Sequence, residues 1–162
     1  MKAVLTIMIS LLALTGCSAL ASDEGNQLKW FKTKEDSIEH GIKEEEISQE
    51  DIIGEIKEDG ETFIFYKKKV IDGIVVELSS VSENDGKYAW YRSDAGVLVK
   101  YNSIEKNAIK VSWENKTQSG KKFIAYTGYT KEQNPTLETE KGSTTPNIDK
   151  NSGIYFYIEP IK

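Results

Sequence analysis

The chain is poor in cysteine and histidine, with one residue of each, Cys17 and His40, among 162. A single cysteine excludes an intramolecular disulfide, so an apolar core must hold the domain together. A lone histidine excludes a histidine zinc cluster, and a Ser-His-Asp triad would have to use His40. We expect His40 to be an exposed residue of a charged helix, and we expect no metal or other cofactor.

Other features are missing as well. No glycine-rich phosphate loop is present. Lys and Arg number 21 against 26 Asp and Glu, so the chain lacks the basic excess of a nucleic-acid-binding protein. No long apolar run follows the first 16 residues, so the remainder is not expected to be a membrane domain.

What is present begins at the N-terminus. After Met1 and Lys2, the 12 residues from Ala3 to Leu14 carry no charge. As a helix this run rises about 18 Å, against roughly 30 Å of bilayer hydrocarbon, so it is short for a stable span. A basic start followed by a short apolar run is typical of a secretory signal peptide.

The run ends in Leu14-Thr15-Gly16-Cys17, which resembles the lipobox of bacterial lipoproteins. The resemblance implies that Cys17 receives a diacylglyceryl group and that residues 1–16 are then removed. Two acyl chains give stable attachment, so the expected partner is the cell membrane, on its extracytoplasmic face. The alternative is an ordinary secretory signal with an incidental cysteine.

Composition divides the rest of the chain into two parts. Residues 17–28 are small and polar and predict a flexible tether. Residues 29–162 have the length of one domain with a self-sufficient core.

The start of this domain has helical patterning. Thr33 precedes acidic residues as an N-cap, and Ile38 and Ile42 share one face, which predicts a helix over about 34–46. Gly41 beside them would permit close packing. A second short helix is expected over 49–53, stopped by Gly54.

From there the apolar period changes to two, which predicts strands. Asp59-Gly60 predicts a primed hairpin turn that pairs Ile56 with Phe63, and Asn84-Asp85-Gly86 predicts another turn. Asp72-Gly73 offers another two-residue turn, but its register would put lysines of 67–69 on the apolar face. We therefore expect a longer loop or a bulge near residues 69–73.

The whole pattern gives seven or eight strands, the last over 154–158. The predicted fold class is α+β, with a short N-terminal helical segment packed on a mostly antiparallel, meander-like twisted sheet. A half-open β-barrel is the alternative. Residues 131–153 form a long polar loop that is either functional or disordered, and disorder is the preferred interpretation.

Two sets of residues are candidate sites. Tyr88, Trp90 and Tyr91 could bind a ligand as an exposed aromatic strip, or they could fill the core. Alternation puts Trp90 and Tyr91 on opposite faces of their strand. Glu77 and Glu114 are acids in apolar strands, as glycoside hydrolysis needs, but we expect both on the solvent face.

Part of the domain is similar to small uncharacterised lipoproteins of Bacillus-type Gram-positive bacteria. The similarity lies in segments 31–42, 53–56, 63–66 and 86–92. It implies a location in the cell envelope, on the outer leaflet, and it brings no activity, ligand or catalytic residue.

These observations favour a membrane-anchored, non-enzymatic binding or interaction module with an envelope protein or glycan as its partner. The alternative is a carboxylate-dependent hydrolase acting on cell-wall glycan. The absence of known motifs favours the first only weakly, because one fold can support many activities.

Replacing Cys17 by Ala should move the protein from the membrane fraction to the medium or leave its signal peptide uncleaved, because the acceptor thiol is lost. Fractionation and metabolic fatty-acid labelling measure this. A wild-type chain that takes up no labelled fatty acid would contradict the assignment.

Overall fold

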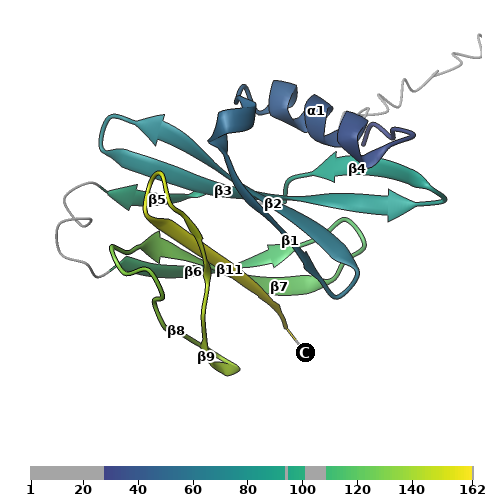
Figure 1. The fold of residues 1–162 in the computed structure, drawn as a ribbon. Coiled ribbons are helices and arrows are strands. Elements are labelled where there is room, and N and C mark those ends of the chain that lie inside the picture. Colours follow the sequence, from purple (N-terminus) through teal and green to yellow (C-terminus); the bar gives the residue numbers. More distant parts are fainter. Residues whose placement is uncertain (1–27, 94, 101–108, 162) are drawn as a thin grey trace, which may run out of the picture.

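The computed structural model describes residues 28–93, 95–100 and 109–161, which form two large antiparallel β-sheets, one two-stranded antiparallel sheet and one α-helix (Figure 1). The predicted signal peptide, most of the tether and Cys17 lie outside these residues. The first sheet contains β1 (Ile52–Glu58), β2 (Glu61–Val70), β3 (Gly73–Asn84), β4 (Lys87–Tyr91) and β5 (Val97–Lys100). The second contains β6 (Ile109–Lys116), β7 (Lys122–Tyr129), β10 (Asn147–Asp149) and β11 (Ile154–Pro160).

The predicted α+β class agrees with this architecture. The expected single meander does not extend through the chain, because only the first four strands follow one another in one sheet. The first sheet follows the order β1-β2-β3-β4, and β5 returns to pair with β3. The second sheet has the order β10-β11-β7-β6. Within the described ranges the strands form separate sheets and no closed barrel.

The helix α1 (Lys34–Glu44) lies across the outer face of the first sheet (Figure 1). Thr33 caps it as predicted, because its hydroxyl accepts a hydrogen bond from the Asp36 N–H at 3.1 Å. The helix ends two residues earlier than expected. The second helical segment is one 3-10 turn, Gln49–Asp51, after which the chain is already extended at Ile52.

Gly54 therefore does not stop a helix. It lies within β1, where a Cβ atom would come within 2.2 Å of the Phe156 ring from the second sheet. The residue is needed for this close approach between the sheets, a tertiary requirement that local patterning does not reveal.

Two hairpins have the predicted primed turns. Asp59 and Gly60 have φ values of 49° and 77°, and Ile56 pairs with Phe63 as expected. Asp85 and Gly86 repeat the arrangement at φ 49° and 68°. Both turns use the aspartate-glycine pairs that the sequence indicated.

The loop or bulge expected at 69–73 is wrong. The turn consists of Ile71 and Asp72, and Gly73 already pairs with Val70. A Cβ atom on Gly73 would lie 2.2 Å from the Val99 carbonyl oxygen, so glycine is required there because β5 approaches closely. Ile71 is 97% exposed at the tip of this hairpin.

This register places a lysine on the apolar side of β2, as the sequence analysis anticipated. Lys67 lies opposite the fully buried Val76, and its ammonium is 2.5 Å from Asp149 Oδ2 of β10. Both side chains are mostly buried. The conflict is thus resolved by an ion pair that joins the two sheets.

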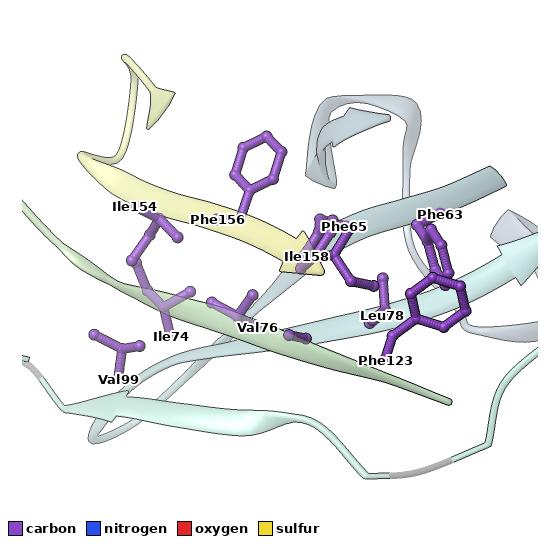
Figure 2. Packing of buried hydrophobic residues seen from close by; sticks show 11 residues of the cluster. Phe63, Phe65, Ile74, Val76, Leu78, Val99, Phe123, Ile154, Phe156 and Ile158 are labelled. Atoms are coloured by element: carbon purple, nitrogen blue, oxygen red, sulfur yellow. The ribbon is translucent and has the colours of Figure 1, made fainter. Parts of the chain in front are cut away.

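The main core lies between the sheets (Figure 2). Aromatic rings meet across it: Phe63 packs edge-on against Phe123 with centroids 4.7 Å apart, and Phe65 lies 4.9 Å from Phe156. Burying a side chain of this size contributes about 1.5–3 kcal/mol. The rest of the cluster is aliphatic: Ile74, Val76, Leu78, Val99, Ala125, Ile154 and Ile158.

Residues 131–153 are not disordered, contrary to the preferred interpretation. They contain β8 (Leu137–Thr139), β9 (Gly142–Thr144) and β10, and Leu137 is buried against Tyr126 on the outer face of the second sheet. Glu159, itself buried, accepts hydrogen bonds from the Tyr126 hydroxyl at 2.8 Å and the Thr139 hydroxyl at 3.0 Å. Polar contacts hold this segment in place. Its low content of aliphatic residues therefore gave a wrong indication of disorder.

Replacing Asp149 by Asn should lower the free energy of unfolding at pH 7 by about 2 kcal/mol, less than the roughly 3–5 kcal/mol lost when a fully buried pair is broken. Burial alone would raise the pKa of Asp149, but hydrogen bonds from Lys67, Ser152 and the Asn151 N–H hold it below its ordinary 3.8. A carboxyl whose folded pKa is depressed contributes stability above its unfolded pKa and loses it as the pH falls through the folded value.

The difference between wild type and Asp149→Asn in urea denaturation should therefore shrink below about pH 4. Asp85→Asn, in an exposed turn, is the matched control and should change little at any pH. A difference that stays constant from pH 7 to pH 3 would show that the ion pair does not carry this stability.

Candidate functional site

The three predicted aromatic residues lie on β4 but do not form an exposed strip. Trp90 is only 6% exposed, and Tyr88 and Tyr91 are half-buried. Trp90 and Tyr91 point to opposite faces of the sheet, as alternation predicted. The face that carries Trp90 is the one covered by α1, so this ring belongs to the packing between helix and sheet.

Gly41 explains how close that packing is. A Cβ atom at this position would lie 2.0 Å from Trp90 Cδ2, so the helix backbone lies directly on the indole ring. The suggestion that Gly41 permits close packing is confirmed. Ile38, one turn earlier, packs into the same cluster with Ile64 and Tyr66 of the sheet.

A groove of about 820 Å³ opens beside this contact and is the candidate site. Three segments form its walls: the chain entering the domain, the C-terminal half of α1, and the end of β4 with the residues after it. The side chains that define its chemistry are Lys29, Phe31, His40, Glu44, Glu45, Trp90, Tyr91 and Arg92.

Glu45 and Arg92, which line the groove, belong to a network of four charged side chains. Glu45 Oε2 lies 2.8 Å from Arg92 Nη1 and 3.1 Å from Lys68 Nζ. Glu77 Oε2 lies 3.4 Å from Arg92 Nη2 and 3.5 Å from Lys68 Nζ. Two carboxylates thus face two cations, which compensates the cost of taking four charges out of water.

The pKa values of two groups are shifted here: Arg92, a member of the network, and Tyr66 beside it. Burial alone would lower the pKa of Arg92, but Tyr66 and the two carboxylates raise it above its ordinary value. Burial raises the pKa of the Tyr66 phenol, which therefore stays protonated. The guanidinium is consequently a fixed positive charge in the groove wall.

Glu77 corrects an expectation from the sequence. It was expected on the solvent face, but it is 6% exposed because α1 and its C-terminal continuation cover that part of the outer face. Glu114 is exposed on β6, as predicted. The two acids named from the sequence therefore lie on different sheets and do not converge.

His40 is half-buried rather than fully exposed. Its ring packs against Phe31 with centroids 5.0 Å apart, and its Nδ1 lies 3.5 Å from Glu44 Oε2. Among the residues that the structure describes, no three His, Cys, Asp or Glu side chains gather as a metal site would require. The contacts of His40 instead place it in the groove wall.

The sequence reasoning missed most of the groove. Lys29, Phe31, Glu45 and Arg92 were not singled out, because they come from segments far apart in the chain. One local signal was available: His40 and Glu44 are four residues apart and must share a face of the predicted helix.

A second hollow, of about 680 Å³, lies at the other sheet between residues 129–134 and the turn at 150–153. Its walls come mainly from two neighbouring loops, and it lacks the charged network of the groove beside α1. The groove is therefore the better candidate.

No helix in residues 28–93, 95–100 and 109–161 is long and apolar enough to cross a membrane. The chain matches no protein-family model, no curated protein and no solved structure. Its function must be argued from the groove itself.

Gly41→Ala should destabilise the domain, although alanine is favoured over glycine in a helix by about 1 kcal/mol. The added methyl group cannot fit between the helix and Trp90, and overpacking of this kind costs about 1–3 kcal/mol. Thermal denaturation would measure the change, with the exposed helical substitution Glu39→Ala as control. A higher melting temperature for Gly41→Ala would show that the helix is not seated on the ring.

Proposed function

We propose that this protein is a lipid-anchored, extracytoplasmic, non-enzymatic binding module whose binding site is the groove between α1 and β4. The observation that carries the proposal is the groove's wall, in which aromatic rings and charges of both signs are already fixed in place. Pre-positioned groups lose little side-chain freedom when a ligand binds, so such a wall suits recognition.

The rigidity of the wall supports this function. Arg92 and Glu45 hold each other, and His40 is packed against Phe31. Glu44 and Lys29 are more exposed and can meet a ligand directly: the Glu44 side chain is 46% exposed, and Lys29 lies on the surface with its ammonium 5.3 Å from the Phe31 ring centroid. The groove thus combines a fixed wall with two accessible charges at its rim.

The position of the groove fits the proposed anchor. Leu28, the first described residue, already lines it. Leu28 follows Cys17 by eleven positions, and a chain of that length reaches at most about 40 Å when extended. A lipid on Cys17 would therefore keep the groove close to the membrane surface, where an envelope partner is encountered.

A carboxylate-dependent hydrolase acting on wall glycan is the second candidate and has less support. Glu45 and Glu77 are close together, as that chemistry needs, because both contact Lys68 and Arg92. A glycosidase acid, however, needs an apolar setting that keeps its proton. Both carboxylates here face two cations, and only Glu45 lines the groove.

The test is capture from membrane and wall extracts by the full chain. Glu44→Lys and Lys29→Glu reverse the two accessible charges and should each weaken capture at least tenfold while leaving the melting temperature unchanged. Glu39→Lys is the matched control, because it makes the same change on the same helix outside the groove. Trp90→Ala is unsuitable, because it would also remove the seat of α1.

Capture that neither charge reversal affects would contradict the groove as the binding site. Release of sugar from a wall glycan by the wild-type chain, lost in Glu45→Gln, would support the hydrolase instead.

A further inference from the structure

The outer edge of β4 carries a short strand pairing that stops abruptly. The Phe31 N–H donates to the Tyr88 carbonyl at 2.8 Å, and the Tyr88 N–H donates to the Phe31 carbonyl at 2.9 Å. The two residues form an antiparallel bridge, and no other bridge joins the entering chain to this edge within the described residues. Residues 28–30, which precede Phe31, make no backbone hydrogen bond to this edge.

This bridge fixes the direction of the next main-chain groups on β4. The N–H and C=O of Tyr88 point away from β3, so those of Trp90, two residues on, point the same way. Trp90 pairs with Val81 only as a non-hydrogen-bonded neighbour. Its N–H and C=O have no hydrogen-bond partner among residues 28–93, 95–100 and 109–161.

The groove lies at this unpaired position. Trp90 contributes to its wall, and Leu28 and Lys29 line it on the side where the entering chain has left the edge. An unpaired donor and acceptor at strand spacing are what an added strand requires. The groove is thus continuous with a strand pairing that already exists.

We propose that the ligand is an extended peptide that adds to the edge of β4 in line with Phe31 and exchanges two hydrogen bonds with Trp90. This inference rests on the proposed function and names the class of partner. The pairing of Phe31 with Tyr88 shows that the edge accepts an antiparallel strand.

The structure also favours one type of side chain in the peptide. Residues directly opposite in an antiparallel pair share a face of the sheet, so the residue facing Trp90 directs its side chain toward α1. Glu44 and His40 line that side of the groove, and Glu45 beside them is already matched by Arg92. A lysine or arginine at this peptide position would complement Glu44.

Two other classes of ligand fit less well. Sugars stack on open aromatic faces, but α1 covers the ring of Trp90 at Gly41. An anionic polymer would meet Glu44 and Glu45 in the groove. A peptide uses both the main-chain groups and the mixed charges.

The probe is a library of random heptapeptides displayed on phage, panned against the full chain and against Glu44→Lys. The wild type should select peptides with a basic residue at one position, and Glu44→Lys should select an acidic residue there. Glu39→Lys should select as the wild type does.

The selected peptide is then synthesised with single N-methyl groups. Methylation of the amide that faces Trp90 should weaken binding at least about tenfold, since it removes one hydrogen bond and introduces a clash. Methylation of the next amide, which points away from β4, should have little effect. Exchange of the Trp90 amide hydrogen should slow at least tenfold in the complex.

The outcomes separate this inference from the proposed function. If groove variants weaken peptide binding but N-methylation shows no alternation and the Trp90 amide is not protected, strand addition is wrong and the binding site stands. If no peptide is selected while Glu44→Lys still reduces capture from envelope extracts, the ligand is not a peptide. If neither charge reversal affects any ligand, both proposals fail.

Discussion

The contact between Gly41 and Trp90 is the constraint on which the rest of the candidate site depends. Without a side chain at residue 41, the helix backbone can lie on the indole ring, and this sets how closely α1 approaches the first sheet. That position brings Glu44 and Glu45 over the end of β4, and it buries Glu77 with its two cations. The groove is the space left between the C-terminal half of α1, the end of β4 and the chain that enters beside them.

Ionic groups then specify how the layers fit together. A lysine buried between two layers needs its partner at one place, because leaving the charge unpaired there is costly. Lys67 meets Asp149 only when β10 sits over the end of β2, and Lys68 meets Glu45 only when α1 ends where it does. The buried carboxylate of Glu159 does the same for the β8–β9 hairpin through Thr139.

Local signals predicted the local structure well. The cap at Thr33 and the turns at Asp59-Gly60 and Asp85-Gly86 depend on neighbouring residues, and all are present as expected. The errors arose where a distant segment decided the outcome: β5 determines the use of Gly73, and polar contacts order 131–153. For the same reason the sequence identified Trp90 and Tyr91 but not the charged residues that surround them.

The bridge between Phe31 and Tyr88 has a mechanical consequence. If Cys17 is held in a lipid layer, any tension between the membrane and a bound partner enters the folded domain through this pair. Two hydrogen bonds carry that load before it reaches the helix, and they lie at the end of the groove itself. Pulling on the anchor would therefore strain the groove first, ahead of the core between the two sheets.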